Sequence, residues 1–333
     1  MPAPAVTGTG QAFIAADVGG THVRVGLLHA GAAQPPKVEH YRKYACARYA
    51  GLADILQDFL SGLPGLDVRH GVIASAGYPL ADGTVITANL PWRLSPHEIR
   101  QRLGFDDLRL VNDFEAVAHA AAHVDASQVL QIIGPEQAPP GPILILGPGT
   151  GLGAAVWIPA PGRAVVLPTE AGQAALTAGN ALEMQLLAYM LQSRPHVAIE
   201  HALSGPGLMN LYQALCALRR SRPVLATPGD ITAAALAGDD PLARECLEVF
   251  CGLLGSTVGD LALVYGVQGG IYLAGGILPQ IRQFLISSSF VQRFLNKGPM
   301  REALQRIPVK LVEHGQLGVI GAASWYLDQS REE

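Results

Sequence analysis

The chain has 333 residues, of which 49% are hydrophobic and 15% charged, so we expect about two well-packed domains and exclude a largely disordered protein. The net charge is −4 with no basic cluster, which argues against nucleic-acid binding. No apolar run reaches about 18 residues, the length of a membrane span. Residues 1–11 lack a signal-peptide pattern, and the four cysteines lack metal-ligand spacing, which predicts a soluble cytoplasmic protein.

The first predicted unit opens with a hairpin. Residues 13–16 and 23–28 are expected to form strands, and between them lies Asp17-Val-Gly-Gly-Thr21, whose glycines suit a tight turn. The next expected elements are a strand near residues 37–44, a helix at 52–60, a strand at 71–75 and a helix opened by Ser95-Pro96.

An apolar run at Leu108–Val111 ends in Asn112-Asp113, and a helix is expected from Glu115 to Ala122. Ligands of α/β sheets bind at such strand ends, so the pair is a candidate for substrate binding. A carboxylate there can accept a proton from a substrate hydroxyl, while the amide orients the same substrate. The alternative is that Asp113 simply caps the helix. This stretch alone leaves both interpretations open.

A second half begins after a change in composition. Residues 124–141 are rich in Gln, Pro and Gly, which places a domain boundary near residue 123. The turn Gly147-Pro-Gly-Thr-Gly-Leu-Gly153 then joins predicted strands at 142–146 and 154–158, repeating the first hairpin. We expect α/β domains at 1–123 and 124–313. The remaining expected elements are helices over 181–265, a strand and turn at 269–277, a strand at 309–312, and a C-terminal helix within 314–333 that returns to the first domain.

The glycine turns are candidate phosphate sites, because backbone N–H groups at such tips can surround phosphate oxygens. The turn 147–153 holds four glycines in seven residues. It is neither a Walker motif nor a dinucleotide fingerprint, because a strand follows it. Thr21 and Thr150 add hydroxyl donors, and Ala274-Gly-Gly-Ile277 is a third close-approach turn. A phosphate-donating nucleotide held between two hairpins is the economical interpretation.

Six motifs occur in the order found in bacterial glucokinases, and the resemblance spans residues 13–327. They are Asp17-Val-Gly-Gly-Thr21, Asn112-Asp113-Phe114, Gly147–Gly153, Glu170-Ala-Gly172, Leu203-Ser-Gly-Pro-Gly207 and Leu273-Ala-Gly-Gly-Ile277. The chain thus resembles a family of the hexokinase, actin and Hsp70 superfamily. This implies an α/β, two-domain actin-like ATPase (ribonuclease H-like) fold with a cleft between a smaller N-terminal and a larger C-terminal domain. It also implies ATP, Mg²⁺ and a hexose as partners, and a homodimer.

The resemblance also implies roles for individual residues, with Asp113 as the catalytic base. The implied sugar ligands are Asn89, Asn112, Asp113, Glu170, Gln173 and Glu200. The implied nucleotide-binding residues are Asp17, Gly19, Gly20, Thr21, Gly147, Gly149, Thr150, Gly151, Gly275 and Gly276. Asp17 would meet the magnesium of Mg-ATP through water.

The sequence departs from the family on the sugar side. Gln173 stands where a histidine is usual, and His22 where an asparagine is usual. A glutamine can hydrogen-bond a hydroxyl but cannot carry positive charge. We expect ATP-dependent phosphorylation of glucose to glucose 6-phosphate. The alternatives are a kinase for another hexose or an amino sugar, and a catalytically weak sugar-binding or regulatory protein. Asp113 favours an enzyme, and the missing histidine favours the weak binder.

Overall fold

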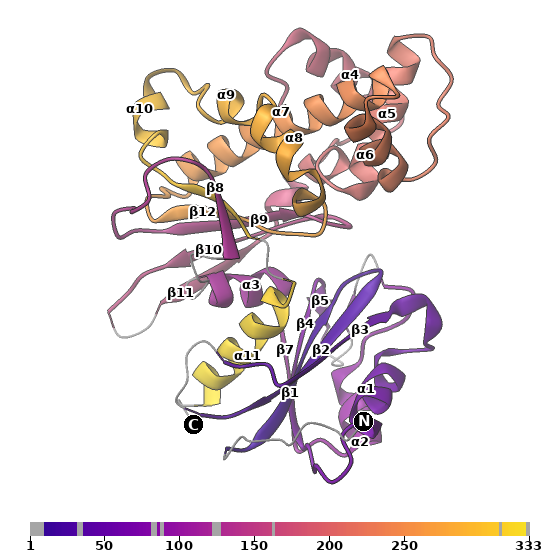
Figure 1. The fold of residues 1–333 in the computed structure, drawn as a ribbon, viewed down its shortest axis with the longest axis vertical. Helices are drawn as coiled ribbons and strands as arrows, with labels where there is room; N and C mark the ends of the chain where they lie inside the picture. The colour runs from indigo at the N-terminus through magenta and orange to yellow at the C-terminus, as the bar shows by residue number, and fades with distance from the viewer. Residues whose placement is uncertain are drawn as a thin grey trace. The chain divides into compact units, whose positions relative to one another are not determined.

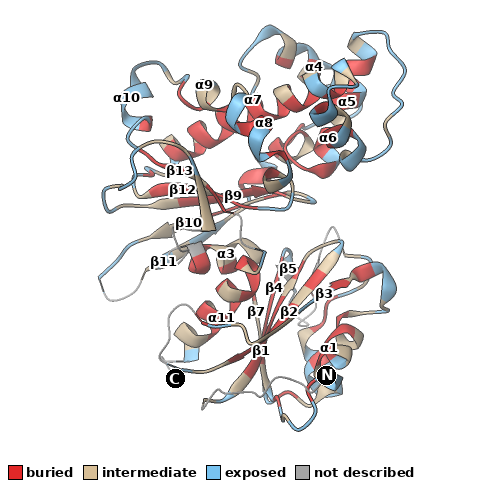
Figure 2. Ribbon diagram, viewed as in Figure 1, coloured by how far each residue is buried: buried red, intermediate tan, exposed pale blue. Residues whose placement is uncertain are grey.

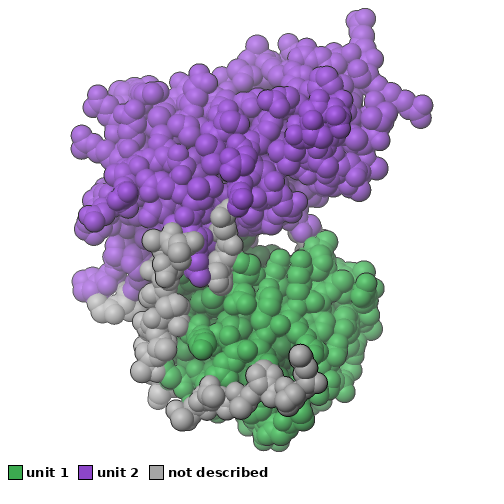
Figure 3. Space-filling view, viewed as in Figure 1, with its two compact units in different colours: residues 1–125, 314–333 green, residues 126–313 purple. Residues whose placement is uncertain are grey.

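The structure is a computed structural model that describes residues 10–31, 36–80, 85–86, 90–121, 128–161, 164–312 and 315–330. The chain forms two compact units, coloured separately in Figure 3. Unit 1 contains residues 1–125 and 314–333, and unit 2 contains residues 126–313. Each unit has its own sheet and its own hydrophobic core, and is described by itself.

Unit 1 is built on a five-stranded sheet of order β3-β2-β1-β4-β7 (Figure 1). Strands β1, β4 and β7 are parallel, whereas β2 and β3 continue from β1 as an antiparallel meander. The bounds are β1 Ala12–Val18, β2 His22–His29, β3 His40–Ala45, α1 Leu52–Ser61, β4 His70–Ser75, α2 Pro96–Leu103, β7 Asp107–Val111, α3 Asp113–Ala121 and α11 Leu317–Ser330, with a small ribbon of β5 Tyr78–Pro79 and β6 Val85–Ile86.

The unit 1 sheet is buried on both faces, as Figure 2 shows for its central strands. Side chains alternate across a strand, so Ile14 and Ala16 of β1 join the core under α1 and α2. Phe13 and Ala15 point the other way, into a second core with α3 and α11. This explains why β1 is apolar at every position from Ala12 to Ala16 rather than at every second position.

Helix α11 completes unit 1 from the far end of the chain. A side chain at Gly321 would collide with the carbonyl of Ala116 in α3, so glycine allows the two helices to pack closely. Trp325 Nε1 donates to Glu115 Oε1 at 3.0 Å, and the Tyr326 hydroxyl donates to Asp107 at 3.0 Å. The C-terminal helix is therefore part of the first unit's core.

Unit 2 repeats this topology in a six-stranded sheet of order β11-β10-β9-β12-β13-β8. Strands β9, β12 and β13 are parallel, and β10 and β11 extend from β9 as a meander. The bounds are β8 Val129–Ile133, β9 Ile143–Pro148, β10 Leu152–Ile158, β11 Val165–Thr169, β12 Gly270–Leu273, β13 Val309–Val312, and 3-10 turns at Ala171–Gln173 and Ile199–His201. The prediction of a glycine-tipped hairpin in each half is confirmed, although in unit 2 strand β8 precedes the hairpin.

Strand β8 was not predicted from the sequence. It lies in the segment interpreted as a compositional boundary, and it pairs antiparallel with β13 at the edge of the sheet. Its partner is more than a hundred residues away in the chain, so local sequence patterns carry little sign of this pairing.

Helices cover the unit 2 sheet and surround α7, Pro241–Val264. Their bounds are α4 Ala181–Leu191, α5 Gly205–Leu218, α6 Pro228–Ala237, α8 Arg282–Ser287, α9 Phe290–Phe294 and α10 Arg301–Leu304. Among the described residues, α7 alone is long and apolar enough to cross a membrane. However, 72% of its most apolar window is buried within the structure, so α7 is the central helix of a core. The four cysteines are buried and free of disulfides.

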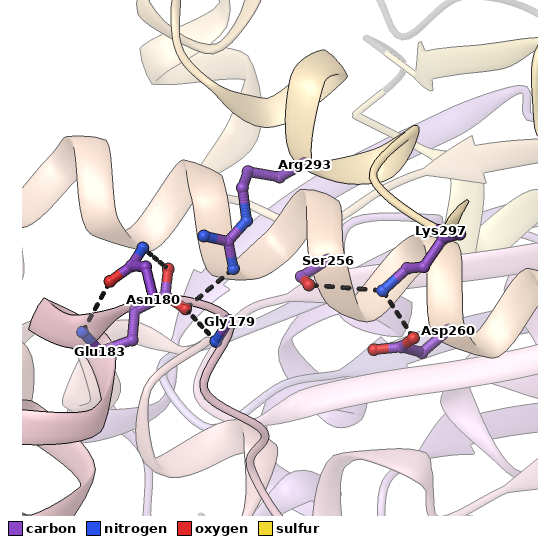
Figure 4. A network of polar contacts seen from close by, with 7 residues as sticks. All are labelled: Gly179, Asn180, Glu183, Ser256, Asp260, Arg293 and Lys297. Carbon is purple, nitrogen blue, oxygen red and sulfur yellow. Dashed lines mark hydrogen bonds and ion pairs between the residues drawn. The ribbon is translucent and has the colours of Figure 1, made fainter. Parts of the chain in front are cut away.

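A buried ion pair anchors the start of α4 to α9 (Figure 4). Arg293 donates to Glu183 at 2.8 Å, and the two side chains are only 12% and 3% exposed. The carboxylate of Glu183 also accepts hydrogen bonds from the N–H of Gly179 and the side chain of Asn180. Nearby, Lys297 pairs with Asp260 at 2.6 Å. The contacts of Glu183 hold the segment Gly179–Asn180 that leads into α4.

Candidate active site

The candidate residues of unit 1 lie at one edge of its sheet. In the parallel register, Asp17 pairs with Ala74 of β4, which in turn pairs with Val111 of β7. The carboxyl ends of β1 and β7 therefore finish on the same side. The turn after Asp17 and the pair Asn112-Asp113 follow these strand ends, where α/β sheets bind ligands.

Asn112, rather than Asp113, is the main cap of α3. Its side-chain oxygen accepts the N–H groups of Phe114 at 3.0 Å and Glu115 at 3.1 Å. Asp113 is the first residue of the helix, and its Oδ1 accepts the N–H of Phe114 at 2.9 Å. Asn112 therefore performs most of the capping that the alternative interpretation assigned to Asp113. A carboxylate at this position is stabilised in its charged form by the helix dipole.

Asp17 is paired within its own hairpin. Arg24, directly opposite on β2, donates to Asp17 Oδ2 at 3.1 Å. Burial raises the pKa of Asp17, and the charge of Arg24 opposes that shift. The first turn of α11 lies close by, because a side chain at Gly318 would come within 2.6 Å of the Asp17 carboxyl carbon. Neither neighbour is predicted from the sequence: hairpin register could have identified Arg24, but no local signal marks Gly318.

The remainder of the first turn is closed by its own backbone. The N–H of Gly19 donates to the carbonyl of His22 at 3.0 Å, and Cys46 Sγ donates to the Gly19 carbonyl at 3.3 Å. Thr21 is exposed beside His22, with 3.3 Å between their side chains. Burial is the largest cause that lowers the pKa of His22, and Lys43 and Arg24 lower it further.

The second glycine turn is shorter than predicted. Gly147 belongs to β9 and Gly153 to β10, so the tip consists of Gly149, Thr150 and Gly151. The N–H of Gly149 donates to the Gly151 carbonyl at 2.8 Å, and the Gly149 carbonyl accepts the N–H of Gly205 at 2.8 Å. The tip is thus tied to the first residue of α5, and one of the predicted phosphate donors is already engaged.

Glycines at this edge of unit 2 fall into two kinds. A side chain at Gly147 would approach the Ala274 carbonyl oxygen to 2.6 Å, and one at Gly275 would approach the Pro148 carbonyl oxygen to 2.5 Å. These two residues let the hairpin and the turn after β12 pack backbone against backbone. In contrast, a side chain at Gly149 or Gly276 would meet no heavy atom within 4 Å. Contacts within the protein therefore give no reason for a glycine at either position.

Gln173 and Glu200 are brought together in unit 2. Gln173 Nε2 donates to Glu200 Oε1 at 2.8 Å, and Glu200 Oε2 accepts the N–H of Leu152 at 3.2 Å. Glu170 precedes the same 3-10 turn, and its carbonyl accepts the N–H of Gln173 at 2.9 Å. Two predicted sugar ligands therefore share a hydrogen bond, and a third, Glu170, lies at the start of the 3-10 turn that carries Gln173.

A short antiparallel pairing holds these turns in register. The N–H of Leu176 donates to the Val197 carbonyl and that of Ile199 to the Ala174 carbonyl, both at 2.8 Å. Ser204 Oγ donates to the Glu200 carbonyl at 2.7 Å. The backbone of Glu200 is therefore fixed on both sides.

Asn89, the remaining predicted sugar ligand, lies outside the described residues. No cluster of three or more His, Cys, Asp or Glu side chains suited to a metal occurs among the residues that the structure describes. Magnesium often keeps its waters and binds through one or two carboxylates plus substrate phosphates. The partly exposed carboxylate of Asp17 fits such indirect contact, since its Oδ2 is already bonded to Arg24.

The architecture of the two units defines the class of protein. Two α/β units with matching sheet topologies, each presenting a glycine-tipped hairpin, form the two-domain actin-like ATPase fold. Solved glucokinase structures share this fold. Glucokinase from an Antarctic psychrotroph has a TM-score of 0.80 and 34% identity, covering 95% of this chain and 98% of that one. A ROK family glucokinase from Streptomyces griseus, in complex with glucose and AMPPNP, has a TM-score of 0.65 and 22% identity, covering 97% and 100%.

Sequence comparison identifies the family. The family model described as Glucokinase matches residues 14–329, and the chain belongs to this family of sugar kinases. A "Glucokinase-like protein" from Xylella fastidiosa strain 9a5c is 59% identical over 319 residues, covering 95% of each chain. A "Glucokinase" from Nitrobacter hamburgensis is 38% identical over 314 residues, covering 94% of this chain and 96% of that protein. The predicted family, fold class and kind of enzyme are confirmed.

Proposed function

We propose that this kinase transfers the γ-phosphoryl group of ATP to the 6-hydroxyl of glucose, with Asp113 as the general base. The observation that carries the proposal is the position of Asp113, at the first residue of α3 and beside the capping Asn112. A pure sugar binder has no need of a base at this place. The glucokinase relatives support glucose as the sugar, and the AMPPNP-bound neighbour supports ATP as the donor.

The proposed reaction is an in-line displacement. The primary hydroxyl oxygen attacks the γ-phosphorus, the bond to the leaving ADP oxygen breaks, and Asp113 accepts the hydroxyl proton. Asn112 would orient the same sugar through its amide nitrogen, because its oxygen is committed to the helix cap. Glu170, Gln173, Glu200 and Asn89 would bind the remaining hydroxyls.

The proposed nucleotide site uses both hairpins. Backbone donors at the tip of residues 149–151 and the hydroxyl of Thr150 would bind phosphate oxygens, and Gly275-Gly276 would allow close approach of the adenosine. Asp17, Gly19, Gly20 and Thr21 of the first hairpin would also contact the phosphates, as the family resemblance implies. Mg²⁺, held by the phosphates and by Asp17 through water, would supply charge neutralisation when bound.

The test is coupled ADP release with Mg-ATP against glucose, mannose, fructose, glucosamine and N-acetyl sugars. Asp113→Ala should lower kcat on the order of a hundredfold or more while sugar binding persists, the scale of general-base removal. Glu115→Gln, in the same helical turn, is the control and should keep wild-type turnover. Unchanged kcat in Asp113→Ala would refute the assignment of the base.

A second candidate is a kinase for another hexose or an amino sugar, and Gln173 is the observation that favours it. A neutral amide beside Glu200 offers a hydrogen bond but no positive charge, which changes the hydroxyl or amine that fits best. Preference for another sugar in the panel would select this candidate. Sugar binding by calorimetry without turnover on any sugar would instead indicate a sensor.

The domain division at residue 123, a cytoplasmic location and a homodimer remain proposals. Sedimentation at micromolar concentration tests the dimer, and a single monomeric species would contradict it.

A further inference from the structure

We propose that Glu200 couples the glycine hairpin to the sugar-binding turn, so that Gly151 is required for sugar binding although it lies in the predicted phosphate loop. The inference rests on the proposed function and deepens it, because it assigns a positioning role within the same site. Gly151 acts on the sugar through Glu200.

The single carboxylate of Glu200 contacts both the glycine hairpin and the turn that carries Gln173. Oε2 of Glu200 accepts the N–H of Leu152, the residue after Gly151, at 3.2 Å. Oε1 accepts Gln173 Nε2 at 2.8 Å. A carboxylate can accept about four hydrogen bonds, so lone pairs remain for a sugar hydroxyl while both contacts persist.

The Glu200 carboxylate occupies the space that a side chain at position 151 would need. A side chain at Gly151 would come within 2.6 Å of Glu200 Oε2, closer than Cβ atoms approach other atoms in proteins. Gly151 is not among the glycines with positive φ, so its backbone conformation makes no separate demand for glycine. The carboxylate of Glu200 is therefore the group that a side chain at position 151 would displace.

The backbone of Glu200 is held in place. Its carbonyl accepts the hydroxyl of Ser204 at 2.7 Å, and a side chain at Gly207 would lie 2.9 Å from that same oxygen. With the backbone of Glu200 held, the flexible end of its side chain is the part that gives way, so a methyl group at position 151 turns the carboxylate away. The bonds to Leu152 and Gln173 change with it.

The consequence is a linkage between the two substrates. A sugar hydroxyl bound to Glu200 fixes the carboxylate and, through Leu152, the hairpin tip. Because linkage is reciprocal, nucleotide bound at the tip must strengthen sugar binding by the factor by which sugar strengthens nucleotide binding.

Gly229 in α6 provides a control outside the proposed site, because a side chain there would come no nearer than 3.7 Å to another heavy atom, Thr227 Oγ1. Glucose affinity is measured by calorimetry without nucleotide in the wild type, Gly151→Ala and Gly229→Ala. We expect Gly151→Ala to weaken glucose binding on the order of tenfold, the scale of a lost hydrogen bond to a charged group. Gly229→Ala should leave the glucose affinity within about twofold of wild type, since no protein atom opposes the methyl group.

A second measurement does not depend on Gly151→Ala folding. Amide hydrogen exchange at Leu152 should accelerate in Glu200→Ala, because its acceptor is lost. In the same variant, the factor by which saturating glucose raises AMPPNP affinity should fall toward one, because the carboxylate that links the sugar to Leu152 is absent.

The outcomes separate the two proposals. Wild-type kinase activity with unchanged glucose affinity in Gly151→Ala, or unchanged Leu152 exchange in Glu200→Ala, overturns the coupling and leaves the proposed function intact. A wild-type protein that neither binds nor phosphorylates any sugar overturns both.

Discussion

The backbone N–H of Ala198 donates a hydrogen bond to Nδ1 of His201 at 3.0 Å. This contact closes the 3-10 turn that carries Glu200, and it requires Nδ1 to be unprotonated. Burial is the largest cause that lowers the pKa of His201; Arg194 adds to the shift and Glu200 opposes it. The folded protein therefore favours the neutral imidazole.

The first prediction follows from the sign of that shift. The contribution to stability is fully present above the ordinary pKa of 6.5 and is lost as the pH falls below it through the folded pKa. Urea unfolding at several pH values should show this loss in the wild type, and His201→Asn should reduce it. His97→Asn, at an exposed position on α2, is the control. Equal acid sensitivity in wild type and His201→Asn would contradict the prediction.

The second prediction concerns Gln173. Its amide does not titrate, whereas a histidine in its place has an ordinary pKa of about 6.5, which the neighbouring Glu200 carboxylate would raise. We expect the kcat/KM of Gln173→His for the sugar to gain a pH dependence near neutrality that the wild type lacks. Gln173→Asn keeps an amide and controls for the altered contact. Parallel pH profiles for the wild type and Gln173→His would show that position 173 does not affect the sugar step.

The third prediction concerns the Arg293–Glu183 ion pair. Arg293→Met leaves the Glu183 carboxylate, 3% exposed, without its cation, and should lower the free energy of unfolding by about 3 kcal/mol or more. The matched control is Asp260→Asn at the neighbouring pair, where Asp260 is 45% exposed and the loss should stay below about 1 kcal/mol. Urea denaturation measures both values. Losses of similar size would mean that burial does not distinguish the two pairs.

The fourth prediction separates structural glycines from ligand-binding ones. Gly147→Ala places a methyl group 2.6 Å from the Ala274 carbonyl oxygen and should destabilise the protein by about 1–3 kcal/mol through overpacking. Gly276→Ala meets no protein atom, so its melting temperature should match the wild type while the KM for ATP rises. An unchanged KM for ATP would remove Gly276 from the nucleotide site.

Several elements were predictable because their signals are local. The strand expected at residues 309–312 is β13, and the Ser95-Pro96 start of a helix is confirmed by the bond from the Glu98 N–H to Ser95 Oγ at 3.3 Å. The tip of the second hairpin was predicted too long, because glycine content alone does not distinguish a turn from strand residues that need close packing. Gly147 is of the second kind, and Gly153 lies within β10.

The sequence by itself determined the family, the glycine-tipped hairpins and the order of the candidate residues, since motif spacing and hydrophobic periodicity are properties of short stretches. Only the tertiary structure decided which atoms meet. Glu200 reaches Leu152 across 48 positions of sequence and Gln173 across 27, and Gly318 meets Asp17 from the opposite end of the chain. Such contacts depend on how complete units pack, because a carboxylate is positioned by the backbone that carries it and by every neighbour that limits its rotation.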